Sequence, residues 1–146
     1  MTPDETARAA AAAMWADDEA SRALGMSLDD VGPGRARLSM TVRRDMVNGH
    51  AICHGGYVFT LADSAFAFAC NSHGRRTVAQ GADVVFVAPA REGDLLVAEA
   101  VERTRSGRSG VYDVTVTDAA SGAVIAEFRG RSREIPGTLL SDPGSD

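Results

Sequence analysis

The stretch 57–70 is apolar at almost every position, and it constrains the fold more than any other feature of this chain. A helix with this sequence has no polar face, so the rest of the protein has to cover it on all sides. Asp63 is the only carboxylate in the stretch. Because an unpaired buried carboxylate is costly, we expect Asp63 either to take part in chemistry with a ligand or to pair with an arginine from elsewhere.

Candidate strands lie on both sides of this helix, which we expect over residues 55–72. Two short strands, 24–31 and 35–43, precede it, and alternating apolar residues give the second a buried face. Four longer candidate strands follow at 77–88, 94–105, 110–118 and 123–134. This order favours an α+β fold in which a long antiparallel sheet wraps around one central helix.

The length of 146 residues suits a single domain. We expect an N-terminal helix within residues 1–20, with Thr2 as N-cap, a main domain over 21–135, and a disordered tail over 136–146, which is rich in Pro, Gly, Ser and Asp. A sheet with one helix leaves strand edges and an apolar flank uncovered. A homo-oligomer is therefore expected rather than a monomer.

Composition and charge exclude several classes of function. A net charge of −5 argues against general nucleic-acid binding. No apolar run approaches the roughly 20 residues of a membrane span, and the N-terminus lacks the features of a signal peptide. The two cysteines, Cys53 and Cys70, form no disulfide-dense pattern. We therefore expect a cytoplasmic protein with free thiols that binds neither nucleic acid nor membranes.

The pair Gly55-Gly56 at the start of the helix offers backbone N–H groups at the positive end of the helix dipole. Such groups can stabilise a developing oxyanion, although glycines also begin helices for ordinary reasons. Asn48 is a neutral donor and acceptor that could orient water or a carbonyl. In an Asn-Gly pair it is also typical of a turn.

His50, Cys53 and His54 are close enough in sequence to suggest a metal site. Zinc needs three or four ligands and supporting contacts, and the only other cysteine and histidine are Cys70 and His73. We therefore expect no metal. Cys53 is a poor candidate for a nucleophile because no Cys-His-Asn or Cys-His-Asp arrangement is evident.

Residues 48–63, which read NGHAICHGGYVFTLAD, resemble the N-G-H-x-x-C-H-G-G…L-A-D signature of the hotdog-fold thioesterases, most closely the phenylacetic-acid-degradation (PaaI) type. Further segments between residues 14 and 134 resemble that family in the same order. The resemblance implies a hotdog fold and an acyl-coenzyme A thioesterase, a thioester hydrolase that needs no cofactor. The implied substrates are phenylacetyl-CoA, hydroxyphenylacetyl-CoA or a similar aryl or medium-sized acyl-CoA of phenylacetate catabolism.

The resemblance also implies roles for residues of the motif. Asp63 would act as a general base on water or as a nucleophile on the thioester carbonyl. The Gly55 N–H would polarise the carbonyl, and Gly56 would leave room for the acyl or thiol group. Asn48 would orient water or the carbonyl, and His54 would fix the loop and shape the oxyanion pocket.

Further residues are candidates for binding the substrate. Thr60 is the one hydroxyl within helical reach of Asp63, and the aromatic rings near it either line an acyl pocket or belong to the core. Three arginines share one face of the last strand, and others flank the hairpin around residue 107, where they could bind the phosphates of coenzyme A or simply be solvated. The candidates are Phe59, Thr60, Phe66, Arg108, Arg129, Arg131 and Arg133.

One geometric argument concerns the oligomer. Asp63 and Gly55 would lie about 12 Å apart along one helix, so both can hardly reach the same carbonyl. We therefore expect a site shared between two subunits, with a dimer as the minimal active unit and, as the family implies, a tetramer made of two dimers. The alternatives are a hotdog module that binds acyl-CoA without turnover, a hotdog dehydratase or hydratase, and a surface scaffold. Asp63 counts against the first and the last, and the L-A-D helix does not resemble the dehydratases.

Overall fold

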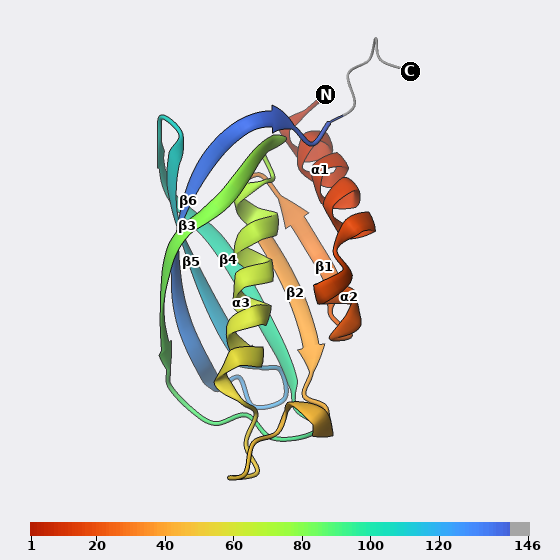
Figure 1. Ribbon diagram of the computed structural model, residues 1–146, viewed down its shortest axis with the longest axis vertical. Helices are drawn as coiled ribbons and strands as arrows, with labels where there is room; N and C mark the ends of the chain where they lie inside the picture. The colour runs from red at the N-terminus through yellow and green to blue at the C-terminus, as the bar shows by residue number, and fades with distance from the viewer. Residues whose placement is uncertain (141–146) are drawn as a thin grey trace.

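The computed structural model describes residues 1–140, which form one antiparallel sheet curled around a central helix, α3 (Figure 1). The strand order in this six-stranded sheet is β1-β2-β4-β5-β6-β3. This is the α+β hotdog architecture expected from the sequence. The elements in chain order are α1 (Pro3–Asp17), α2 (Glu19–Ala23), β1 (Ser27–Gly32), β2 (Arg35–Thr41), a short 3-10 helix η1 (Arg44–Met46), α3 (Gly55–Cys70), β3 (Arg75–Phe86), β4 (Leu95–Ser106), β5 (Ser109–Asp118) and β6 (Val124–Thr138).

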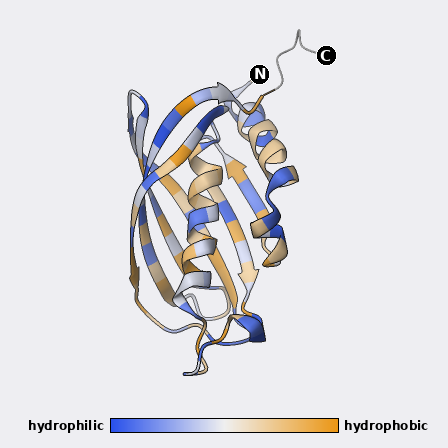
Figure 2. Cartoon of the chain, in the orientation of Figure 1, coloured by the Kyte–Doolittle hydropathy of each residue, from blue (hydrophilic) through white to orange (hydrophobic). Residues whose placement is uncertain are grey.

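The core lies between α3 and the concave face of the sheet. In β2 the alternating residues Ala36, Leu38 and Met40 are buried, as the period of two in the sequence predicts. Figure 2 shows that α3 is apolar over most of its length. Apolar burial on this scale is the main favourable term in folding, so the contact of α3 with the sheet organises the domain.

The N-terminal segment forms two helices instead of one. In α1 the Thr2 hydroxyl accepts a hydrogen bond from the Glu5 N–H at 3.1 Å, which confirms the expected N-cap. The short α2 was not expected from the sequence. It is capped by Asp18, and its Ser21 hydroxyl is hydrogen-bonded to the Ser64 hydroxyl of α3 at 2.8 Å, so a buried polar contact joins the two helices.

The C-terminal strand is longer than expected. Residues 136–138 continue β6, and the Leu139 N–H donates to the Gly74 carbonyl at 2.9 Å. The expectation of a disordered tail from residue 136 is therefore wrong for 136–140, because hydrogen bonds order this segment. The rest of the expected tail, 141–146, lies outside the described residues.

Strand β3 is an edge of the sheet and pairs only with β6. Four large apolar residues on or next to this edge are exposed in the single chain, namely Val78, Val85, Phe86 and Val87. An exposed apolar edge strand is a typical site for pairing with another chain. Within residues 1–140, no helix is both long and apolar enough to cross a membrane.

Candidate active site

One backbone N–H at the start of α3 has no acceptor. His54 is the N-cap, and its Nδ1 accepts a hydrogen bond from the Gly56 N–H at 3.2 Å. The Tyr57 N–H donates to the His54 carbonyl at 3.0 Å. Across residues 1–140, no atom accepts from the Gly55 N–H. The positive end of the α3 dipole therefore presents one available donor.

The loop before α3 is folded by Asn48. The Asn48 Oδ1 accepts from the backbone N–H of His50 at 2.9 Å and of Ile52 at 3.3 Å. This tight loop includes Ala51, whose φ of 61° is in the left-handed region. The side-chain oxygen of Asn48 therefore holds the loop, and contact with a substrate is left to the side-chain NH₂.

Next to these groups lies an apolar pocket with a volume of about 540 Å³. Asn48 and Gly55 are among the residues that line it. The volume is within the range of roughly 300–1,000 Å³ that is usual for small-molecule sites. The other lining residues are Ile52, Cys53, Val58, Phe86, Val87, Ala88, Pro89, Ala90 and Ile125.

Sequence analysis missed most of this pocket. The sequence places residues 89–93 between two expected strands, whereas in the structure Pro89 and Ala90 line the pocket. The only available signal was the apolar run that leads into Pro89. Burial raises the pKa of the Cys53 thiol, which disfavours the reactive thiolate and agrees with its exclusion as a nucleophile.

Asp63 is only partly buried and has no ion-pair partner among the residues that the structure describes. Burial raises the pKa of its carboxyl above the usual value. The neighbouring Thr60 hydroxyl donates instead to the Gly56 carbonyl at 2.8 Å. The alternative prediction, an ion pair between Asp63 and an arginine, is therefore not found among the residues that the structure describes.

Asp63 belongs to a stripe of α3 that the chain's own sheet does not fully cover. This α3 stripe consists of Gly56, Phe59, Thr60, Asp63 and Ala67, which recur at helical spacing. Asp63 does not line the 540 Å³ pocket, and it is about 12 Å from Gly55 along the helix. One chain therefore places the oxyanion donor and the carboxylate apart.

The two aromatic candidates of α3 differ in exposure. Phe59 is partly exposed and packs edge-to-face on Phe128 at a centroid distance of 5.4 Å. Phe66 is only 1% exposed, lies between Tyr112 and Phe128, and covers the backbone of β6. The ring of Phe66 therefore lies in the core and does not line the 540 Å³ pocket, and its binding of substrate stays a prediction.

The arginines of β6 lie on the convex face of the sheet, since their neighbours in the strand are buried. Arg129 donates to both oxygens of Asp113, at 2.6 and 2.8 Å, and holds the pKa of that carboxyl at about 2. Arg131 donates to Asp83 at 2.9 Å. Arg133 has no ion pair within residues 1–140. Arg129 and Arg131 would have to share or leave their carboxylates to bind a phosphate.

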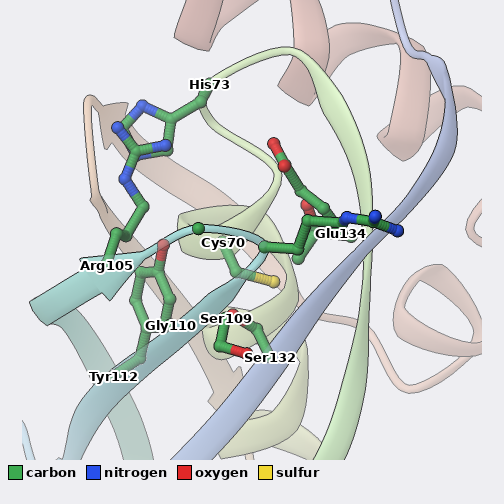
Figure 3. A pocket seen from close by; sticks show the side chains of 11 residues that line it. Cys70, His73, Arg105, Ser109, Gly110, Tyr112, Ser132 and Glu134 are labelled. Atoms are coloured by element: carbon green, nitrogen blue, oxygen red, sulfur yellow. The ribbon is translucent and has the colours of Figure 1, made fainter.

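Arg108 lies at the other end of α3, beside a small polar pocket lined by Cys70, His73 and Tyr112 (Figure 3). The hydroxyl of Tyr112 donates to Glu102 at 2.7 Å, and His73 Nε2 lies 2.8 Å from the same oxygen. The volume of about 20 Å³ is enough for about one water, so no acyl group fits. Within the described part of the chain, no three His, Cys, Asp or Glu residues are placed to bind a metal ion.

Comparison with known proteins places this geometry in a family context. The sequence model of the Thioesterase superfamily matches residues 50–125. The acyl-coenzyme A thioesterase PaaI of Escherichia coli (strain K12) is 42% identical over 130 residues, which are 89% of this chain and 92% of that protein.

Two solved structures are similar over most of the chain. The structure of the E. coli PaaI protein from the phenylacetic acid degradation operon has a TM-score of 0.91 and 40% identity, and the match covers 94% of this chain and 99% of that one. A mutant of the phenylacetic acid degradation protein PaaI from Thermus thermophilus has a TM-score of 0.77 and 35% identity. That match covers 81% of this chain and 100% of the other.

Proposed function

Because the chain belongs to the thioesterase superfamily, we propose that it hydrolyses acyl-coenzyme A thioesters whose acyl group is phenylacetyl, hydroxyphenylacetyl or of similar medium size. Its activity is that of an acyl-coenzyme A thioesterase, a thioester hydrolase. The arylacetyl preference and a place in phenylacetate catabolism are the proposed part. They are supported by the names of the PaaI relatives and by the apolar lining of the 540 Å³ pocket.

The observation that carries the proposal is that the Gly55 N–H has no acceptor among residues 1–140 and that Gly55 lines an apolar pocket. In the proposed mechanism this N–H donates to the thioester carbonyl oxygen as it becomes negative. His54 keeps the helix start in place by capping Gly56, and the NH₂ of Asn48 orients the carbonyl or water. Asp63 takes the proton of the attacking water, or attacks the carbonyl itself. Burial raises the pKa of Asp63, which makes its carboxylate a stronger base.

We further propose that a dimer is the minimal active unit and that two dimers form a tetramer. Three features support a second copy: the separation of Gly55 from Asp63, the α3 stripe, and the unpaired apolar edge of β3. In a two-fold dimer, Asp63 of one chain would approach Gly55 and Asn48 of the other. The coenzyme A phosphates would bind to Arg108, Arg129, Arg131 or Arg133. Arg108 and Arg133 have no ion pair within residues 1–140, so only Arg129 and Arg131 would have to exchange one. A cytoplasmic location stays a prediction.

The activity is tested by free-thiol release from a panel of acyl-CoA esters, with Asp63→Asn as the matched variant. We expect turnover by the wild type, fastest for arylacetyl esters, and a loss of about 10²–10⁴-fold in kcat for the variant. No hydrolysis of any ester would leave only the alternative of a binding module. Activity of Asp63→Asn within a few-fold of the wild type would remove Asp63 from the mechanism.

The shared site is tested by mixing two variants that are each nearly inactive, Gly55→Pro and Asp63→Asn. Random pairing makes about half of the dimers mixed, and each mixed dimer regains one intact site of two, so activity should return to about a quarter of the wild type. Native mass spectrometry verifies that subunits have exchanged. A mixture that exchanges but stays inactive would place Gly55 and Asp63 in the site of the same chain.

A further inference from the structure

We propose that Phe86 selects the acyl group, because its ring forms the aromatic wall of the pocket beside the oxyanion donor and favours a flat arylacetyl group over a short acyl group. This inference rests on the proposed function and adds the residue that sets its substrate preference. Phe86 is the last residue of β3 and, within residues 1–140, the only aromatic residue that lines the pocket.

The ring lies directly against the start of α3. A Cβ atom added at Gly55 would be 2.9 Å from Cζ of Phe86 and 3.2 Å from Cε1. The ring can occupy this place only because residue 55 has no side chain. Phe86 is thereby held next to the residue whose N–H is proposed to bind the carbonyl oxygen.

The ring of Phe86 is more exposed to solvent than the other side chains on the same face of β3. Alternation along β3 puts Ala82, Val84 and Phe86 on the face turned towards α3. Ala82 and Val84 pack against the core, whereas Phe86 is 52% exposed. A large ring with half of its surface in water, at the edge of an apolar pocket, is available for stacking with a ligand.

Backbone hydrogen bonds hold the segment that follows Phe86 and lines the pocket. The Val87 N–H donates to the Ile125 carbonyl at 2.8 Å, and the Cys53 N–H donates to the Ala90 carbonyl at 2.7 Å. The second bond joins the loop before α3 to the segment after β3, and the first joins that segment to β6. An acyl group in this pocket would meet aliphatic side chains and the ring of Phe86.

Offset or edge-to-face contact between two aromatic rings exceeds simple apolar contact by about two- to tenfold in affinity. The acyl group keeps this contact from the ground state to the transition state, so the effect belongs in kcat/KM and KM rather than in kcat. An acetyl group has no ring that could make this aromatic contact. The preference for phenylacetyl over acetyl esters is the quantity that Phe86 should control.

The experiment compares kcat/KM for phenylacetyl-CoA and acetyl-CoA in the wild type, Phe86→Leu and Phe86→Tyr. Val78→Ala is the matched control, since Val78 is an exposed apolar residue of the same strand that does not line the pocket. We expect Phe86→Leu to lower the ratio of the two kcat/KM values by about two- to tenfold, chiefly through KM for the aryl ester. Phe86→Tyr, which keeps the ring, should retain the wild-type ratio, and Val78→Ala should not change it.

Two results would overturn the inference. An equal fall for both esters in Phe86→Leu would mean that the ring only positions Gly55. A shift towards monomer, measured by light scattering, together with an unchanged ratio would mean that Phe86 packs against a second copy. Failure of the proposed function is seen separately, because the wild type would then hydrolyse neither ester.

Discussion

Replacement of Gly55 by proline removes the proposed oxyanion donor while leaving the helix start in place. Proline has no backbone N–H, and it is favoured at the first position of a helix, which is the position of Gly55 in α3. The residue before a proline prefers extended backbone. His54 already has φ −60° and ψ 133°, so the backbone around residue 55 does not need to change.

The expected size of the effect follows from what the N–H does in the structure. It donates to no atom of residues 1–140, so its removal breaks no hydrogen bond of the folded chain, and proline in place of glycine at a compatible site stabilises by about 0.4–1 kcal/mol. In the transition state, loss of one oxyanion-hole donor costs about 10²–10³-fold in kcat. We therefore expect a folded protein that is nearly inactive.

Gly55→Ala is the matched control because it introduces the same Cβ next to Phe86 but keeps the N–H. The half-exposed ring can turn away from that Cβ in both variants. The assay measures kcat by thiol release and stability by urea unfolding. We expect kcat of Gly55→Ala to be about 10²-fold or more above kcat of Gly55→Pro. The free energy of unfolding of Gly55→Ala should be equal to or lower than that of Gly55→Pro. Equal kcat values for two folded variants would refute the role of the Gly55 N–H.

Three further predictions concern other parts of the molecule. Burial raises the pKa of Asp63 in the folded protein above its ordinary value of 3.8. The folded protein therefore loses stability as pH rises from 3.8 through the raised pKa and the carboxyl ionises. Asp63→Asn should therefore have a higher Tm than the wild type at pH 8 and the same Tm below about pH 3.8. The kcat of the wild type should fall as acid protonates Asp63. Both quantities are measured over a series of pH values. Gly130→Ala would place a Cβ 2.0 Å from the ring of Phe66, so urea unfolding should show a loss of about 1–3 kcal/mol or more. Arg133→Ala should raise KM for a CoA ester but not for the matching pantetheine ester, and an equal rise for both would indicate a structural role.

Elements with a strong local signal could be predicted from the sequence. The alternation in β2 and the capping pattern of α1 are encoded within a few residues, so both elements were expected close to their observed bounds. The short α2 depends on the buried contact of Ser21 with Ser64, far away in the chain. The end of β6 likewise depends on pairing with β3, which overrides the turn-forming composition around residue 136.

The candidate site divides in the same way. The arrangement of His54, Gly55 and Gly56 is local to the helix start, and its motif was visible in the sequence. Phe86 was missed because its place against Gly55 results from packing between β3 and α3. Phe66, by contrast, was a candidate for binding the substrate because of a local signal. Helical spacing puts it near Asp63, but only the sheet determines which face of an apolar helix is covered.

The mismatch between the sequence of α3 and its surroundings links the oligomer to the chemistry. A helix that is apolar on almost every face is expected to be buried all round, yet the α3 stripe stays partly exposed in one chain. The proposed second copy would cover this stripe and would remove further water from Asp63. Less water around a carboxylate raises its pKa and strengthens its interaction with nearby polar groups. The same contact would bring Gly55 of the other chain towards Asp63, so the surface that needs a partner for burial is also the surface on which the proposed reaction takes place.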